Sequence, residues 1–254
     1  MDKAELQLRR DIVAACRSMN AMGINQGTSG NISARYGDHM LITPSGVPYD
    51  EMDPKDIVPM PLKGPYGSYE GDLVPSSEWR FHLDIMLARP EVGSVVHTHS
   101  TYATTLAICG LEIPPVHYMI AAAGGPSIRV APYATYGTEE LSKNALRALE
   151  GRTCCLLGNH GMIATGATLK RAMWLAVELE TLAKQYYLTL AIGKPQILSE
   201  VEIGHVVEKF SSYGPRPKGE KKVAKPAARR HPVAKASARA AAAKRPAAGR
   251  SRAK

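Results

Sequence analysis

Hydrophobic and polar positions along the chain predict helices that alternate irregularly with short strands. Apolar side chains recur at helical spacing between residues 4 and 22, and Gly23 follows them as a stop signal. Two short alternating runs, residues 31–35 and 40–43, then have the pattern of paired strands. Residues 47–75 are rich in Pro and Gly, which predicts loops and short strands that cross a surface.

The second half of the chain continues in the same way. Ser76 is a typical helix N-cap residue, and the helix that it opens ends before Pro90, because the residue before a proline disfavours helical backbone. We further expect a strand over residues 93–100, a helix that starts within 101–108, a strand over 153–157, a long helix capped by Thr168 that runs to about Gly193, and a last helix over 200–210. These elements predict a layered α/β domain with a mixed sheet.

Charge is distributed unevenly along the chain. The 254 residues carry a formal net charge of +9. Residues 216–254 hold 14 of the 32 Lys and Arg residues and one acidic residue, Glu220, which leaves residues 1–215 with a net charge of −4. The basic character of the whole chain is therefore no evidence that the folded part binds nucleic acid.

From Lys218 onward the sequence consists almost entirely of Ala, Lys, Arg and Pro. Such a composition cannot bury enough apolar surface to offset the entropy of ordering the chain. We therefore predict one domain over residues 1–217 and a disordered basic tail over 218–254. The tail has the charge to bind nucleic acid or an anionic surface by releasing counterions. It lacks interleaved aromatic residues, so a solvated charged extension explains it equally well.

The cysteines and the N-terminus predict a cytoplasmic protein. The four cysteines form no C-x-x-C pair, and Cys154 and Cys155 are adjacent, which suits free thiols in a reducing compartment. The first residues lack the apolar core of a signal peptide, and no apolar run reaches the length of a membrane span. We expect no membrane partner.

Two histidines, His97 and His99, stand two residues apart in the strand expected over 93–100. On a strand such residues point to the same face, about 6.6 Å apart along the chain. Both imidazoles can then bind one zinc ion, with bonds of about 2.0 Å. Half-buried histidines that form hydrogen bonds to the backbone would give the same pattern. The pair is thus half of a candidate metal site.

The remaining ligands have to come from elsewhere in the chain. His160 is the best candidate, because the glycines around it let its turn approach a neighbouring strand. Three neutral nitrogen ligands with an open fourth position are typical of a catalytic zinc ion, and Glu78 would supply a titratable group beside it. The other histidines fit less well: His39 and His82 stand at expected surface positions, His205 on the last helix and His231 in the tail, while His117 beside Tyr118 is harder to exclude.

Three clusters of Gly, Ser and Thr in the first third of the chain have the composition of a phosphate site. They are Thr28–Asn31, Thr43–Gly46 and Ser76–Ser77. Hydroxyl groups and exposed backbone N–H groups at turns bind phosphate well, although such clusters are also common in ordinary turns. Neither a P-loop nor a G-x-G-x-x-G motif is present, so nucleotide binding has no support.

Seven segments resemble, in order, the class II aldolase/adducin family: "GTSGNIS", "ITPSGVPYDEM", "PSSEWRFH", "VVHTHS", "PPVHYMIAAAGG", "APYATYGTEEL" and "LLGNHGMIATGATLKRAMWLAVELETLAKQY". The similarity covers about residues 5–217, which is everything except the basic tail. It implies a three-layer α/β/α sandwich around a mainly antiparallel nine-stranded sheet. It also implies ring-like homotetramers with active sites between subunits.

The resemblance assigns roles to individual residues. It implies zinc on His97, His99 and His160, with Glu78 as the adjacent carboxylate and further ligand. It places the substrate phosphate against Asn31, Ser45, Gly46, Ser76 and Ser77, with Thr28 and Gly30 shaping the loop. Tyr118 matches a tyrosine that reaches into the neighbouring subunit's site, and Tyr213 and Arg216 match a C-terminal segment that closes over the substrate.

The activity that the resemblance implies is the reversible cleavage of a ketose 1-phosphate, of the L-fuculose 1-phosphate type, into dihydroxyacetone phosphate and a short aldehyde. Aldolases for 5-deoxyribulose or 5-methylthioribulose 1-phosphate, and related epimerases and dehydratases, share the metal histidines and remain alternatives. The segment "LGNHG" departs from the Gln-His pair of the fuculose enzymes, so the sugar preference stays open. The adducin head shares the fold without catalysis, but such a head should lack the metal ligands that are present here.

Overall fold

The computed structural model describes residues 1–210. These described residues belong to one compact unit. The predicted tail over 218–254 and the boundary before it lie outside the described residues, as do Tyr213 and Arg216. Within residues 1–210, none of the helices combines the length and the apolar character needed to cross a bilayer.

A seven-stranded mixed sheet forms the centre of the unit. Its strand order is β3-β2-β1-β4-β7-β6-β5, and every neighbouring pair is antiparallel except the parallel pair β5–β6. The strands are β1 (Asn31–Tyr36), β2 (His39–Ile42), β3 (Val58–Pro61), β4 (Ser94–Thr98), β5 (Val130–Ala131), β6 (Cys154–Leu157) and β7 (Gly161–Gly166). The predicted mainly antiparallel sheet is confirmed.

The expectation of nine strands is wrong for the described residues, which form seven. Two further contacts, Pro44–Pro75 and Ile113–Ile128, are single isolated bridges. Proline has no N–H group to donate to a ladder, so the first of these bridges cannot extend through its own residues into a pair of strands.

Helices cover both faces of this sheet. They are α1 (Lys3–Ala21), α2 (Trp79–Ala88), α3 (Thr101–Ile108), α4 (Glu139–Ala148), α5 (Leu169–Ile192) and α6 (Glu200–Phe210), with short 3-10 helices η1 (Pro54–Asp56) and η2 (Tyr118–Ala123). The predicted cap of the long helix is confirmed, because the Thr168 hydroxyl accepts a hydrogen bond from the N–H of Arg171 at 3.2 Å.

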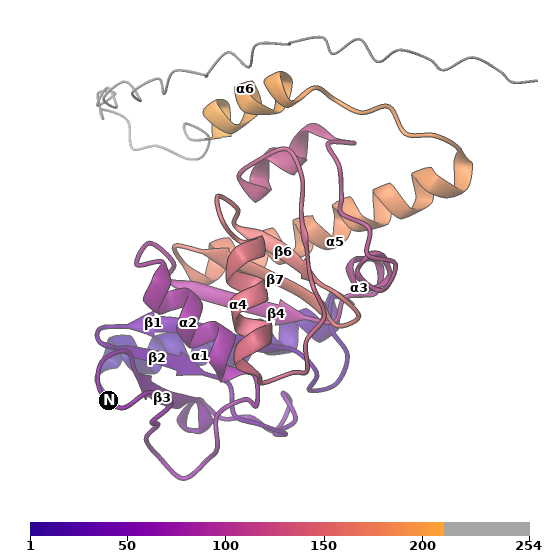
Figure 1. The fold of residues 1–254 in the computed structure, drawn as a ribbon. Coiled ribbons are helices and arrows are strands. Elements are labelled where there is room, and N and C mark those ends of the chain that lie inside the picture. The colour runs from indigo at the N-terminus through magenta and orange to yellow at the C-terminus, as the bar shows by residue number, and fades with distance from the viewer. Residues whose placement is uncertain (211–254) are drawn as a thin grey trace, which may run out of the picture. The chain divides into compact units, whose positions relative to one another are not determined.

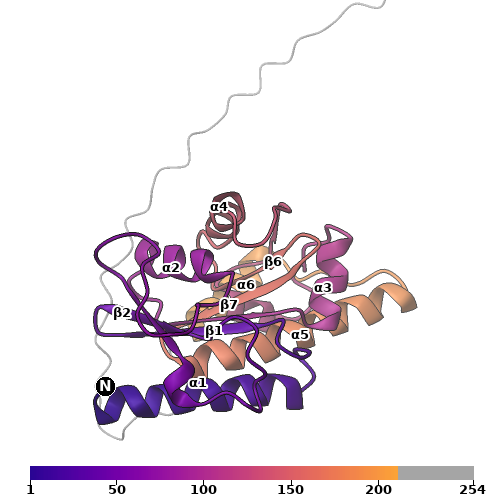
Figure 2. The ribbon, with the colours of Figure 1, turned by 90° about the horizontal axis from the view of Figure 1, so that it is seen from below.

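Alternating side chains on the strands feed two separate hydrophobic cores. On β4, Val96 packs in a core shared with α1, α3 and α5, whereas Val95 packs in a core shared with α2 and α4. Figures 1 and 2 show the resulting layers, with α1 and α5 on one face of the sheet and α2 and α4 on the other. The predicted three-layer α/β/α sandwich is therefore confirmed.

The start of α2 differs from the expectation that Ser76 is its N-cap. The helix begins at Trp79, and Glu78 occupies the N-cap position. Ser76 instead forms a tight turn before the helix: its hydroxyl accepts from the N–H of Glu78 at 3.3 Å and its carbonyl accepts from the N–H of Trp79 at 2.9 Å. The Glu78 side chain makes no capping hydrogen bond, so its carboxylate is available to neighbouring strands.

Candidate active site

The four candidate metal ligands meet at one edge of the sheet, where β4 ends, β6 turns into β7 and α2 begins. His97 lies near the end of β4, directly opposite Asn31 on β1, and His99 follows β4. His160 lies in the turn between β6 and β7, and Glu78 lies at the N-cap of α2. Antiparallel pairing of β4 with β7 carries the turn to the same edge as His97.

The side chains of these residues converge closely. The ligand atoms of Glu78, His97, His99 and His160 all lie within 4.8 Å of one another. His97 Nε2 lies 3.1 Å from Glu78 Oε2, His160 Nε2 lies 3.1 Å from Glu78 Oε1, and the Nε2 atoms of His97 and His99 are 3.1 Å apart. Glu78 and His97 are buried, while His99 and His160 are half-buried.

The protonation of the cluster suits a metal ion. His97 Nδ1 donates to the carbonyl of Met162 at 2.9 Å, which leaves the lone pair of Nε2 directed at the cluster. Burial, with the neighbouring His97 and His160, lowers the pKa of His99 to about 4, so this imidazole is neutral near pH 7. Burial opposes ionisation of Glu78, but positive charge beside it, at His97 and His160 or on a cation that they bind, outweighs burial and holds the pKa of this carboxyl below its usual range.

One observation favours a cation over hydrogen bonds alone. Glu78 Oε1 is buried and has no hydrogen-bond donor, although it lies beside His160. A buried carboxylate oxygen that receives no hydrogen bond is costly, and a metal ion would satisfy it. Nitrogen atoms of three histidines and one carboxylate oxygen form a donor set that zinc prefers. The residues therefore fit a zinc ion.

Gly161 is required for the approach of the third histidine. A Cβ atom at this position would lie 2.5 Å from the carbonyl oxygen of Thr98, 2.9 Å from His99 Cδ2 and 3.2 Å from His97 Cε1. Asn159, which precedes His160, has a left-handed backbone with φ of 53°, which asparagine tolerates better than most residues. These two positions let the β6–β7 turn press His160 against β4.

A cavity of about 360 Å³ opens onto this cluster. Its lining residues are Thr28, Ser29, Ser77, Glu78, His99, Tyr133, Ala134, Tyr136, Asn159 and His160. Of the residues expected to bind phosphate, Thr28 and Ser77 thus lie directly on the cavity. Sequence reasoning missed Tyr133 and Tyr136, which are 59% and 65% exposed. The aromatic pair within "APYATYG" was the signal that pointed to them.

The other residues expected to bind phosphate do not line this cavity. Backbone hydrogen bonds of 2.9 Å from Ser45 N to the Val74 carbonyl and from Ser76 N to the Thr43 carbonyl join their two segments. Gly46 in this turn has a left-handed backbone, with φ of 72°. Gly30 lies so close to β4 that a Cβ atom there would be 2.7 Å from the carbonyl oxygen of His97.

Asn31 and His82 lie deeper than expected. Asn31 is 4% exposed, and its Nδ2 donates to Glu78 Oε2 at 2.9 Å. The surface position expected for His82 is wrong, because its side chain is completely buried and its Nε2 lies 2.5 Å from Asn31 Oδ1. The spacing Glu78-x-x-x-His82 on one helix face was the signal that could have revealed it.

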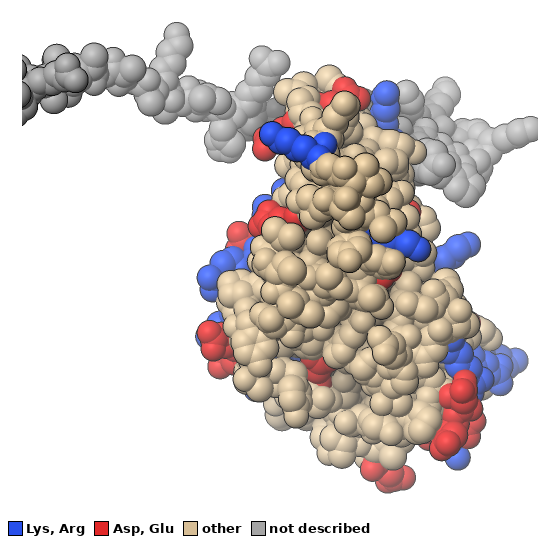
Figure 3. Space-filling view, turned by 90° about the vertical axis from the view of Figure 1, so that its right-hand side faces the viewer, with Lys and Arg blue, Asp and Glu red and all other residues tan. Residues whose placement is uncertain are grey.

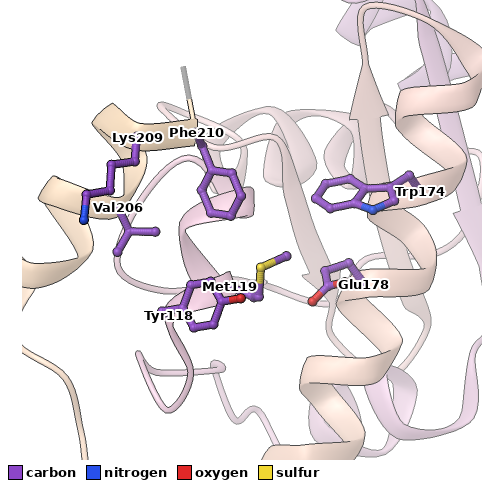
Figure 4. A pocket seen from close by; sticks show the side chains of 7 residues that line it. All are labelled: Tyr118, Met119, Trp174, Glu178, Val206, Lys209 and Phe210. Carbon is purple, nitrogen blue, oxygen red and sulfur yellow. The ribbon is translucent and has the colours of Figure 1, made fainter. Parts of the chain in front are cut away.

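Tyr118 lies at a different place. It begins η2, is 52% exposed, and lines a separate cavity of about 550 Å³ between η2, α5 and α6. Figure 4 shows its ring near Met119 and opposite Glu178 and Trp174. The neighbouring His117 accepts from the N–H of Met119 at 3.3 Å and does not belong to the metal cluster. Within one chain, Tyr118 is therefore not part of the cavity over the histidines.

Comparison with known proteins agrees with this geometry. The profile of the class II aldolase and adducin N-terminal domain matches residues 10–187. The chain is 51% identical to a 5-methylthioribulose-1-phosphate/5-deoxyribulose-1-phosphate aldolase of Rhodospirillum rubrum, over 84% of this chain and 96% of that protein. It is 48% identical to an L-fuculose phosphate aldolase of Escherichia coli K12, over 83% of this chain and 97% of that protein.

Solved structures agree as well. An L-fuculose 1-phosphate aldolase superposes with a TM-score of 0.77 at 39% identity, covering 81% of this chain and 96% of that one. A structure titled as a putative aldolase/epimerase/decarboxylase, YgbL from Escherichia coli, superposes with a TM-score of 0.72 at 26% identity, covering 81% of this chain and all of the other. From the matching profile, the similar sequences and the shared fold we conclude that the chain belongs to the class II aldolase and adducin N-terminal domain family.

Proposed function

We propose that the protein is a zinc-dependent aldolase that cleaves a ketose 1-phosphate into dihydroxyacetone phosphate and a short aldehyde. The observation that carries the proposal is the set of three histidines and Glu78, whose ligand atoms lie within 4.8 Å of one another beside a cavity lined by hydroxyl groups. A non-catalytic, adducin-like binding module would have no use for this set.

His97, His99 and His160 would hold the zinc ion, with Glu78 beside it. A zinc ion there would act as a Lewis acid that withdraws electron density from the carbonyl and hydroxyl oxygens of the substrate. Glu78 lies 3.1 Å from both His97 and His160, so it can exchange contact with the metal for contact with a proton. In cleavage it returns a proton to C3 of dihydroxyacetone phosphate, and in synthesis it removes that proton.

The hydroxyl-rich loops supply positioning. Thr28 and Ser77 line the cavity, and the turn with Ser45 and Gly46 is hydrogen-bonded to the segment that carries Ser76. Their hydroxyl and backbone N–H groups would bind the phosphate, which does not react. Binding energy from this group then holds the reacting carbon atoms in place. Asn31 would donate one N–H to Glu78 and the other to the substrate.

We propose further that the enzyme is a homotetramer in which Tyr118, in the site of a neighbouring subunit, takes the proton from the hydroxyl that becomes the aldehyde oxygen in cleavage and returns it in synthesis. Tyr118 is exposed and lies away from the histidines of its own chain, as such a role requires. The C-terminal half of α5 also exposes Tyr187, Leu188, Leu190 and Ile192, and uncharged side chains predominate on the face in Figure 3. Exposed apolar surface of this kind favours contact with another protein. Tyr213 and Arg216 would close over the substrate.

The aldehyde end of the substrate distinguishes the alternatives. The relatives named for L-fuculose phosphate and for 5-methylthioribulose and 5-deoxyribulose 1-phosphate have nearly equal identity to this chain. Tyr133, Tyr136 and Asn159 line the cavity beside the histidines and would contact this end. We therefore propose either L-fuculose 1-phosphate or a 5-substituted ribulose 1-phosphate as substrate.

Zinc analysis combined with cleavage assays on a panel of these ketose 1-phosphates tests the proposal, with ribulose 5-phosphate epimerisation as a parallel assay. We expect about one zinc ion per chain and release of dihydroxyacetone phosphate from at least one of them. His97→Ala should lose both zinc and cleavage. A His97→Ala variant that is free of zinc and fully active would refute the scheme.

A further inference from the structure

A continuous row of buried hydrogen bonds runs from the sheet to Glu78. Ser33 Oγ lies 2.7 Å from His82 Nδ1, His82 Nε2 lies 2.5 Å from Asn31 Oδ1, and Asn31 Nδ2 lies 2.9 Å from Glu78 Oε2. The four side chains are between 0% and 5% exposed. Ser33 and His82 are not among the residues that the proposed reaction uses, so their burial needs another explanation.

Two matching spacings create this row. Asn31 and Ser33 are separated by two positions on β1, so they point to the same face of the sheet, about 6.6 Å apart. Glu78 and His82 are separated by four positions at the start of α2, so they lie one above the other on one face of the helix, about 6 Å apart. The helix packs on this face of the sheet, which aligns the two pairs.

The directions of the hydrogen bonds follow from the chemistry of the groups. The ionised Glu78 carboxylate only accepts, so the Asn31 amide must present its nitrogen to Glu78 and its oxygen to His82. His82 must therefore donate from Nε2. Burial, together with the nearby His97, lowers the pKa of His82 to about 3, so the ring is neutral and its Nδ1 accepts from the Ser33 hydroxyl.

The far end of the row is also fixed. The Ser94 hydroxyl donates to the backbone carbonyl of Ser33 at 2.6 Å, which ties β1 to β4 at this point. The ring of His82 stacks on Phe81, with centroids 4.6 Å apart. Neither the ring nor the Asn31 amide can turn over without leaving a buried acceptor against another acceptor.

We propose that His82 is a positioning residue of the active site, which acts through Asn31. By donating from Nε2 it keeps the Asn31 nitrogen turned toward Glu78 and the substrate cavity, and it thereby holds the Glu78 carboxylate beside the metal histidines. The proposal deepens the proposed aldolase function and rests on it for its effect on turnover. Its effect on zinc binding does not depend on which reaction the protein performs.

Two polar substitutions of His82 separate positioning from packing. The side-chain nitrogen of glutamine reaches about the place of Nε2, whereas that of asparagine reaches about the place of Nδ1, on the Ser33 side. His82→Gln should therefore keep the donor to Asn31, and His82→Asn should lose it. Losing such a supporting hydrogen bond around a metal site costs about 10- to 100-fold in metal affinity or activity.

The experiment measures kcat, KM and the zinc dissociation constant for the zinc-loaded protein and these variants, the last by competition with a chelator. We expect His82→Asn to lose about 10- to 100-fold in kcat and in zinc affinity, and His82→Gln to stay within about threefold of the parent protein. The double variant His82→Asn with Asn31→Ala should be no worse than Asn31→Ala alone, because both remove the same orientation. Met86→Leu, a buried change on the same helix, serves as the packing control and should change neither quantity.

The measurements distinguish a failure of the role proposed for His82 from a failure of the proposed aldolase function. Equal impairment of His82→Gln and His82→Asn would overturn the proposal, as would an additive double variant or an unimpaired His82→Asn. If the parent protein binds zinc but cleaves none of the ketose phosphates, the proposed function fails. The zinc affinities of the variants would still decide the role of His82.

Discussion

Substitution of Gly161 by alanine should displace the metal ligands without disturbing the rest of the fold. The new Cβ atom would lie 2.5 Å from the carbonyl oxygen of Thr98 and 2.9 Å from His99 Cδ2. An ordinary contact is at least 3.4 Å, so the turn or the end of β4 must move by about 0.9 Å. The Thr98 oxygen belongs to the backbone of β4, and His99 Cδ2 belongs to the ring of a metal ligand. Neither atom can move away from the new Cβ atom without displacing the metal ligands.

The size of the effect follows from this displacement. Overpacking of a close-packed site costs about 1–3 kcal/mol of unfolding free energy. A shift of about 1 Å in a catalytic constellation costs about 100-fold in rate. We therefore expect Gly161→Ala to retain the fold, to bind zinc more weakly, and to lose about 100-fold in kcat.

The assay combines urea unfolding, zinc content after dialysis and initial cleavage rates on the best ketose 1-phosphate. Gly204→Ala is the matched control, since a Cβ atom there meets nothing within 4 Å inside α6 and alanine favours helical backbone. It should leave zinc content and kcat unchanged. Parent-like zinc content and kcat in Gly161→Ala would refute the steric reasoning.

Three further predictions concern the carboxylate, the subunit interface and pH. Glu78→Gln should still bind zinc through the three histidines, although more weakly, and should lose about 10²- to 10⁴-fold in kcat when loaded with zinc, because a proton-transfer group is removed; a parent-like rate would exclude Glu78 from proton transfer. Tyr118→Phe and Glu78→Gln should each be nearly inactive alone, yet mixed and reassembled subunits should recover part of the activity if sites form between subunits; no recovery in proven mixed oligomers would contradict this arrangement. The pKa of His82 is lowered from 6.5 to about 3 by burial and by the nearby His97, so the unfolded chain binds one proton more than the folded one between these values. This group should therefore reduce the unfolding free energy of the zinc-free protein by about 1.4 kcal/mol per unit as pH falls below 6.5. His82→Gln should flatten that slope in urea titrations, and an unchanged slope would show that His82 is not responsible.

Local patterns were sufficient for much of the fold. The periodicity of α1 and α5 and the β-branched run of β4 are short-range properties, and the Thr168 cap depends only on the residues that follow it. Local patterns did not predict the role of Ser76 correctly. Its hydroxyl could cap a helix or form a turn, and the bridge between Pro44 and Pro75 holds its segment in the turn. The bridge to Pro44, which is distant in the sequence, therefore decided that Ser76 forms a turn and not a helix cap.

The candidate site likewise has a part that sequence patterns predicted and a part that they did not. The two-residue spacing of His97 and His99 and the glycine after His160 predicted three side chains that the structure does bring together. His82 was misjudged as a surface residue, because its spacing from Glu78 shows only that the two share a helix face and not what covers that face. Its burial depends on the Asn31–Ser33 face of β1, which lies about 50 positions earlier in the chain.

The sequence by itself determined the type of domain, the helices and strands with strong periodicity, and the chemistry of the zinc ligands, because each of these depends on residues that are neighbours along the chain. Only the tertiary structure decided that the sheet has seven strands in the described residues, that Asn31 faces Glu78, and that His82 is buried behind both. These features arise where segments far apart in the sequence pack against each other. Register and burial, which no local pattern contains, therefore fix the geometry of the site.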